Sequence, residues 1–150
     1  MDLLLWRHAQ AADGMPDLER PLTERGRAQA RAMAEWLRPR LPAGLRILVS
    51  PARRARETAA ALGLPFEIVE AIAPDADAAT VLSAAGWPDA DRPALIVGHQ
   101  PTLGAVAATL LTGNPSPLHV AKGAVWWLRA RGGDARDAAL VAALGPKLLG

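Results

Sequence analysis

The chain has 150 residues, of which 51% are hydrophobic and 21% charged, a composition typical of a globular domain with a buried core. It contains no cysteine, which excludes thiolate catalysis, disulfide bonds and cysteine-ligated zinc. The net charge is only +2, and the first apolar run is too short for a signal sequence or a membrane span. We therefore expect a cytoplasmic monomer, a single domain over residues 1–150, without nucleic-acid or membrane partners.

The first segment predicts a strand followed by a helix. Leu3 to Trp6 form a short apolar run, which is typical of a buried strand, and Arg7 and His8 follow it directly. Thr23 is the predicted N-cap of the helix. The apolar face of this helix repeats at spacings of four, three and four residues, at Gly26, Ala30, Met33 and Leu37.

The middle of the chain predicts two more strands and two more helices. Residues 45–49 form the second apolar run, and Ser50 is the predicted cap of a helix with Pro51 at its first position. Further along the chain, we expect a short strand over 66–69 and a short helix over 78–84.

The last third of the chain begins with a strand over 94–97, which leads through a glycine and a histidine into a helix starting near Pro101. Two late strands over 124–129 and 138–143 are joined by a predicted hairpin-type turn at 132–134. Strands that alternate with helices predict an α/β fold. We expect a three-layer sandwich with a mostly parallel central sheet and helices on both of its faces.

Three of the predicted strands bring basic or imidazole side chains to the same edge of the sheet. Arg7 and His8 follow the first strand, Arg54 follows the second, and His99 follows the strand over 94–97. In open parallel sheets the ligand crevice lies beyond the carboxyl ends of the strands. Two imidazoles and two guanidiniums, gathered with little opposing charge, favour a phosphoryl group as the ligand.

Each of these residues also has a structural explanation. Taken alone, an arginine-histidine pair after a strand is a surface charge and a polar strand terminus, and His99 is a histidine that satisfies a turn. The two constellations together favour chemistry, because a neutral imidazole is a nucleophile toward phosphorus and arginines relieve the repulsion between it and a phosphate dianion. His119 lies in a proline-rich stretch without a preceding strand, and we interpret it as a surface or structural histidine.

Four motifs occur in an order that is typical of one enzyme family. They are Arg7-His8-Ala9, Arg20-Pro21-Leu22-Thr23-Glu24-Arg25-Gly26, Ser50-Pro51-Ala52-Arg53-Arg54-Ala55-Arg56-Glu57-Thr58-Ala59 and Val97-Gly98-His99-Gln100-Pro101. Together they resemble the histidine phosphatase superfamily. The short length and the Arg-Pro-Leu-Thr element are similar to the SixA-type phosphohistidine phosphatases, and the resemblance extends from Leu3 to Leu128.

The resemblance implies a fold like that of the phosphoglycerate mutases and a phosphoryl transfer in two steps. His8 becomes transiently phosphorylated, while Arg7, Arg54 and His99 hold the phosphoryl oxygens. Arg54 is preferred over Arg53 because the arginine of the family lies four residues after the serine. The arginines and His99 take the place that magnesium has in other phosphoryl transfers, so no metal or other cofactor is expected.

The resemblance also implies two substrate-binding residues. Arg20 matches an arginine at the rim of the site, and its structural alternative is a salt bridge to Glu19 or Glu24. Gln10 stands where some relatives carry an acid. The glycine that usually follows the nucleophile is Ala9 in this chain, a small change that we expect the site to tolerate.

The proton donor for the leaving group has no obvious counterpart in the sequence. Asp77 is the candidate favoured by alignment and Asp75 is its alternative, although acids in loops are usually solvated surface groups. A phosphoramidate leaves as neutral imidazole once its nitrogen is protonated. The absence of a strong acid therefore favours phosphohistidine over an alkyl ester as the substrate.

We therefore expect a metal-independent phosphatase that acts on phosphohistidine in a partner protein. One alternative is a phosphomonoesterase acting on small phosphorylated metabolites such as sugar or nucleotide phosphates. Another is a catalytically idle module that binds phosphate or a phosphoprotein. Because His8 attacks only as the neutral imidazole, we expect activity to fall between about pH 8 and about pH 5.

Overall fold

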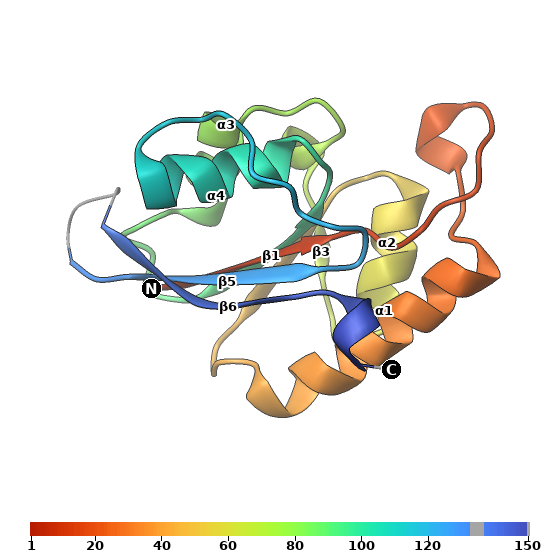
Figure 1. Cartoon of the computed structure of the whole chain (residues 1–150), viewed down its shortest axis with the longest axis horizontal. Coiled ribbons are helices and arrows are strands. Elements are labelled where there is room, and N and C mark those ends of the chain that lie inside the picture. The colour runs from red at the N-terminus through yellow and green to blue at the C-terminus, as the bar shows by residue number, and fades with distance from the viewer. Residues whose placement is uncertain (133–136, 150) are drawn as a thin grey trace.

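The computed structural model describes residues 1–132 and 137–149, which are arranged around one six-stranded sheet (Figure 1). The strands lie in the order β3-β2-β4-β1-β5-β6. Their bounds are β1 Asp2–Arg7, β2 Arg46–Val49, β3 Glu67–Ile68, β4 Ala94–Gly98, β5 Val125–Ala130 and β6 Ala138–Leu144. The first four strands in this order are parallel, while β5 runs antiparallel to β1 and β6 antiparallel to β5. The predicted mostly parallel sheet is confirmed.

Four α-helices cover the two faces of the sheet, which confirms the three-layer arrangement (Figure 1). Helices α1 (Glu24–Leu37) and α2 (Arg53–Ala60) pack on one face, and α3 (Ala78–Ala85) and α4 (Thr102–Thr112) pack on the other. Four short 3-10 helices complete the described chain: η1 Asp17–Glu19, η2 Arg38–Arg40, η3 Glu70–Ile72 and η4 Pro146–Leu149. None of the helices in the described residues has the length and apolarity needed to cross a membrane.

The apolar runs of the central strands are continuous because both faces of the sheet are buried. In β1, Leu3 and Leu5 join the core beneath α3 and α4, whereas Leu4 and Trp6 join the core beneath α1 and α2. Successive strand residues point to opposite faces, so each run contributes to both cores. The charged residues of β1 and β2 therefore lie at the strand ends, at Asp2, Arg7 and Arg46.

The start of α1 lies where the sequence predicts it. The Thr23 hydroxyl accepts a hydrogen bond from the Gly26 amide at 3.0 Å, which is the expected N-cap. A Cβ atom at Gly26 would collide with the main-chain carbonyl of Gln10, so the glycine allows α1 to approach the loop after β1. This contact gives the last residue of the Arg20–Gly26 motif a packing role.

The predicted start of α2 is wrong by two residues. The helix begins at Arg53 with Ala52 as its N-cap residue, not at Pro51 with Ser50 as the cap. The Ser50 hydroxyl accepts a hydrogen bond from the Ala52 amide at 3.2 Å and lies against an imidazole from another strand. The predicted turn at 132–134 extends beyond the described residues.

Candidate active site

The carboxyl ends of three neighbouring parallel strands place Arg7, His8, Arg54 and His99 around one cavity. Main-chain hydrogen bonds between the strands continue to these ends. The amide of His8 donates to the carbonyl of Gly98 at 3.0 Å, and the amide of Ser50 donates to the carbonyl of Val97 at 3.0 Å. The cavity has a volume of about 360 Å³. It is lined by Arg7, His8, Ala11, Asp17, Arg20, Arg54, Pro74, Asp75, His99, Gln100 and Lys122.

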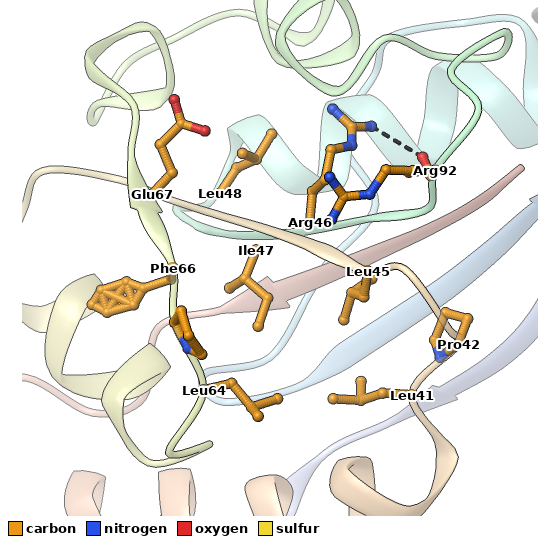
Figure 2. Close-up of a pocket in the computed structure, with 11 residues that line it drawn as sticks. Leu41, Pro42, Leu45, Arg46, Ile47, Leu48, Leu64, Phe66, Glu67 and Arg92 are labelled. Atoms are coloured by element: carbon orange, nitrogen blue, oxygen red, sulfur yellow. Dashed lines mark hydrogen bonds between the residues drawn. The ribbon is translucent and has the colours of Figure 1, made fainter.

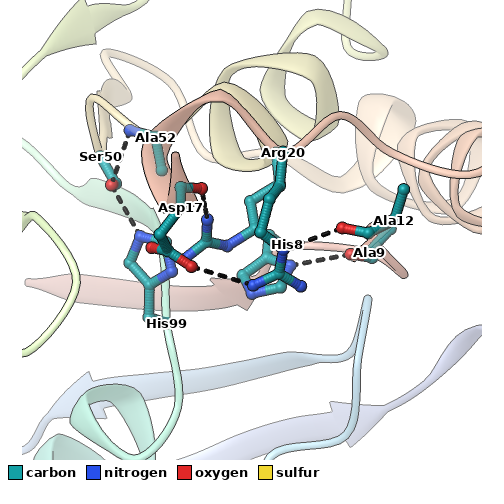
Figure 3. Close-up of polar contacts among 9 residues, drawn as sticks. His8, Ala9, Ala12, Asp17, Arg20, Ser50, Ala52 and His99 are labelled. Carbon is teal, nitrogen blue, oxygen red and sulfur yellow. Dashed lines mark hydrogen bonds and ion pairs between the residues drawn. The ribbon is translucent and has the colours of Figure 1, made fainter. Parts of the chain in front are cut away.

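His8 is held as a neutral imidazole with one nitrogen available for attack. Its Nδ1 lies 2.8 Å from the Ala9 carbonyl oxygen, which only accepts, so Nδ1 carries the proton and Nε2 keeps its lone pair (Figure 3). Burial lowers the pKa of His8 to about 4, and the nearby Arg54 and Arg7 charges contribute to this shift. The fall in activity that we expected between pH 8 and pH 5 therefore moves to lower pH.

His99 faces His8 and is oriented by Ser50. The ring centroids of the two histidines lie 5.2 Å apart, and His99 Nε2 lies 2.7 Å from the Ser50 Oγ atom. The Ser50 oxygen accepts from the Ala52 amide and has its own proton to donate to His99 Nε2; in this arrangement the ring proton of His99 lies on Nδ1. Burial lowers the pKa of His99 to about 3, with a further contribution from His8. His99 is thus a neutral hydrogen-bond donor.

Arg54 is fixed relative to His8 through one hydroxyl group. The Thr58 side chain donates to the Arg54 carbonyl at 2.8 Å and accepts from the Ala9 amide at 3.1 Å. The Thr58 hydroxyl thereby links the first turn of α2, at Arg54, to Ala9, the residue after His8. Arg54 is 5% exposed and lines the cavity, whereas Arg53 is an exposed residue that pairs with Glu57 at 3.6 Å. The structure brings Arg54 rather than Arg53 to the cavity.

Three buried donors of the cavity residues have no hydrogen-bond partner among the described residues. They are Nε of Arg7, Nε of Arg54 and Nδ1 of His99. Arg7 is anchored separately, since its NH1 donates to the Val120 carbonyl at 2.9 Å. Buried donors are almost always satisfied, so three on residues that line one cavity favour a ligand with several acceptor oxygens. A phosphoryl group has this chemistry.

The charge of the cavity also fits a phosphoryl dianion. Four cationic side chains and two carboxylates line it, which leaves a net charge of +2 with both histidines neutral. Burial lowers the pKa of the Arg7 guanidinium, which marks how far this cation is removed from water. Within the described residues, no cluster of three or more His, Cys, Asp or Glu side chains could hold a metal ion.

Asp17 and Ser50 belong to this site although the sequence did not single them out for it. The Asp17 carboxylate contacts Arg20 at 3.0 Å (Figure 3). It also contacts Arg54 at 3.1 Å. Arg20 thus lies at the rim, as the resemblance implied, and its salt-bridge partner is Asp17 rather than Glu19 or Glu24. The Asp17-Arg20 spacing of three residues was a local signal, but the contact with Arg54 spans 37 residues and has no counterpart in the sequence pattern.

Two of the predicted site residues do not line the cavity. The Gln10 side chain accepts from the Thr23 hydroxyl at 2.9 Å, and Asp77 caps α3 by accepting from the Thr80 amide at 2.8 Å. Asp75 does line the cavity, on a main chain with φ of 72°. The substrate-binding role of Gln10 and the proton-donor role of Asp77 stay predictions. His119 is exposed and does not line the cavity.

Comparisons with known proteins identify the family. A model of the histidine phosphatase superfamily (branch 1) matches residues 3–75. The chain is 32% identical over 127 residues to the phosphohistidine phosphatase SixA of Escherichia coli K12, a match that covers 79% of both proteins. The chain belongs to the histidine phosphatase superfamily, whose members are phosphatases.

Solved structures extend the similarity to nearly the whole chain. A SixA homologue from Nakamurella multipartitia has a TM-score of 0.84 at 30% identity, covering 97% of this chain and 95% of that one. The protein histidine phosphatase SixA in complex with tungstate has a TM-score of 0.82 at 27% identity, covering 100% of both chains. The resemblance to the SixA type, suggested by the four motifs, is confirmed.

Proposed function

We propose that the protein removes phosphoryl groups from histidine side chains of a partner protein, through a phosphohistidine formed at His8 and without a metal ion. The observation that carries the proposal is the state of His8. The imidazole is neutral, with the Nε2 lone pair free of the proton on Nδ1, and it lies beside a cavity of net charge +2. The residues of this cavity hold three buried donors that find no partner within the described part of the chain. A nucleophile and the donors for a trigonal phosphoryl group are therefore together before the substrate binds.

In the first step, Nε2 of His8 attacks phosphorus in line with the leaving group. The new N–P bond forms as the bond between phosphorus and the substrate nitrogen breaks, and that nitrogen takes a proton from water. Arg7, Arg54 and His99 donate to the equatorial oxygens, where negative charge is concentrated. In the second step, water attacks phosphorus, the N–P bond to His8 breaks, and inorganic phosphate and a proton are released.

Phosphohistidine on a protein is favoured over a phosphate ester by the chemistry of the leaving group. The protonated imidazole nitrogen leaves as a neutral ring, whereas an alkoxide needs a strong acid. Asp77 caps a helix, and Asp17 is a poor acid because hydrogen bonds from Arg20 and Arg54 lower its pKa. The Escherichia coli relative is named a phosphohistidine phosphatase and the tungstate-bound one a protein histidine phosphatase, which supports the same substrate.

The test is phosphate release in the presence of EDTA from a histidine-phosphorylated carrier protein and from p-nitrophenyl phosphate, side by side. We expect rapid release from the protein, weak release from the ester, and neither with His8→Ala. Rapid mixing with the ³²P-labelled carrier should trap label on the wild type that is stable in alkali and lost in acid. Strong ester turnover with an untouched carrier would instead assign a small-molecule phosphatase, and binding without labelling an idle module.

A further inference from the structure

The rim of the cavity carries a carboxylate that joins two guanidiniums. Asp17 Oδ2 accepts from NH2 of Arg54 at 3.1 Å, and Asp17 Oδ1 accepts from NH1 of Arg20 at 3.0 Å (Figure 3). The Asp17 main-chain oxygen also accepts from NH1 of Arg54 at 2.8 Å. The Arg54 side chain is 6% exposed and that of Asp17 is 51% exposed. Asp17 therefore spans from the buried cation to the mouth.

The contacts of Arg20 show what this carboxylate does to the mouth. Arg20 Nε donates to the Ala12 carbonyl at 2.8 Å, and its NH1 is taken by Asp17. An arginine at a cavity mouth would otherwise attract any second anion of a substrate. In this pair Arg20 holds the loop through Ala12 and Asp17, and the half-exposed Asp17 carboxylate places a negative group beside it at the mouth. Asp75 adds a second carboxylate to the lining.

We propose that Asp17 is a specificity-determining residue, which disfavours substrates that carry a second negative charge close to the phosphoryl group. The favoured class has a neutral or cationic group attached to phosphorus, such as an imidazole ring, and the disfavoured class includes phosphorylated carboxylic acids and bisphosphates. This inference rests on the proposed function for the identity of the phosphoryl site. It goes beyond that function by assigning the selection among substrates to one side chain.

The test uses two ligands that the protein cannot hydrolyse and that differ by one carboxylate: methylphosphonate and phosphonoacetate. Their dissociation constants are measured by titration calorimetry for the wild type and for Asp17→Asn. The variant removes the repulsion between the Asp17 carboxylate and the carboxylate of phosphonoacetate, and it frees Arg20 to bind that carboxylate. Each change should strengthen binding of phosphonoacetate roughly three-fold at a surface dielectric. The affinity for phosphonoacetate should therefore rise about ten-fold relative to that for methylphosphonate. Asp17→Glu, which restores the charge, should restore the wild-type ratio.

Glu19→Gln is the matched control, because Glu19 is an exposed carboxylate in the same 3-10 helix that does not line the cavity. We expect it to leave the ratio of the two dissociation constants unchanged. An unchanged ratio in Asp17→Asn, with both ligands weakened equally, would overturn the inference and leave Asp17 as a support for Arg54. Because binding needs no turnover, this result is distinguishable from failure of the proposed reaction, which appears as wild-type protein that releases no phosphate.

Discussion

The two ends of the sheet carry cavities of opposite character. The cavity at the carboxyl ends of β1, β2 and β4 holds about 360 Å³, and a groove at the amino ends of β2 and β3 holds about 570 Å³ (Figure 2). The larger one is mostly apolar. It is lined by Leu41, Pro42, Leu45, Arg46, Ile47, Leu48, Leu64, Pro65, Phe66, Glu67 and Arg92. Size therefore does not identify the functional end of this molecule.

The difference lies in what the arginines do. At the amino end, Arg46 NH2 donates to the carbonyls of Ala85 at 2.6 Å and Arg92 at 3.1 Å, and Arg92 Nε donates to Gly44 at 2.7 Å. These guanidiniums hold loops together. Among the buried side-chain donors of the described residues, three without a partner belong to the carboxyl-end cavity, and one, Nε of Arg46, belongs to the amino-end groove. Unmatched donors mark a ligand site better than volume does.

The largest expected effect distinguishes two neighbouring arginines of α2, one inside the carboxyl-end cavity and one outside it. Arg54→Ala should lower kcat/KM for phosphate release by about 10³-fold, because one preorganised donor to the developing charge is lost. Arg53→Ala should change kcat/KM by less than about two-fold, since Arg53 is exposed and outside the cavity. Comparable losses in both variants would contradict the assignment of the phosphoryl clamp.

The carboxyl-end histidines should also make the fold sensitive to acid. Burial lowers the pKa of His8 from 6.5 to about 4, so between these values the unfolded chain binds a proton that the folded chain does not. The free energy of unfolding should therefore fall as the pH drops through this window, by about 2 to 3 kcal/mol for His8 alone. Urea unfolding gives the free energy of unfolding at pH 7, above this window, and at pH 4.5, inside it, and the difference between the two measures the change.

Substitution separates this effect from other titrations. His8→Asn should reduce the dependence of the unfolding free energy on pH, with the contribution of His99 remaining, whereas His119→Asn, at an exposed position, is the matched control. The same depressed pKa predicts that the free-enzyme kcat/KM stays level down to about pH 5 as far as His8 is concerned. A midpoint near pH 6.5 would show that His8 is solvated.

A smaller effect tests the orientation of His99. Ser50→Ala removes the hydroxyl that lies 2.7 Å from His99 Nε2, so the ring is no longer held with its Nδ1 proton toward the cavity. We expect kcat/KM to fall by about ten-fold, the size of one lost hydrogen bond. Ser83→Ala, at an exposed position on α3, is the matched control and should leave kcat/KM unchanged. No loss in Ser50→Ala would show that packing alone orients His99.

The smallest expected change in activity belongs to the amino end. Arg46→Met removes the two hydrogen bonds to loop carbonyls and should lower the free energy of unfolding by about 1 to 2 kcal/mol. The kcat/KM per folded molecule should stay as in the wild type, because the groove lies at the opposite end of the sheet. Arg31→Met, at an exposed position on α1, controls for loss of charge. A lower kcat/KM per folded molecule in Arg46→Met would show that the amino-end groove influences the cavity at the carboxyl end of the sheet.

Local sequence patterns were sufficient for the layers of the fold and for the convergence of the main site residues. A short apolar run bounded by turn residues is typical of an inner strand, and the residues that follow parallel strands meet at one edge of the sheet. His8, Arg54 and His99 follow from that rule, and the four ordered motifs add the family. The choice of Arg54 over Arg53 came from the motif spacing, and the contact of Thr58 with the Ala9 amide gives it a physical reason.

What only the tertiary structure decided are the partners of those residues. The sequence predicts Ser50 as a helix cap, but in the structure its hydroxyl contacts and orients the ring of His99, 49 residues away in the sequence. Asp17 belongs to none of the four motifs, yet its carboxylate accepts a hydrogen bond from Arg54, 37 residues away in the sequence, and lies at the mouth of the cavity. Asp75 rather than Asp77 lines the cavity, because the loop turns through a left-handed conformation at Asp75 while Asp77 caps α3. Spacing along the chain fixes which residues share an edge, whereas a hydrogen bond depends on atomic positions that the packed layers alone determine.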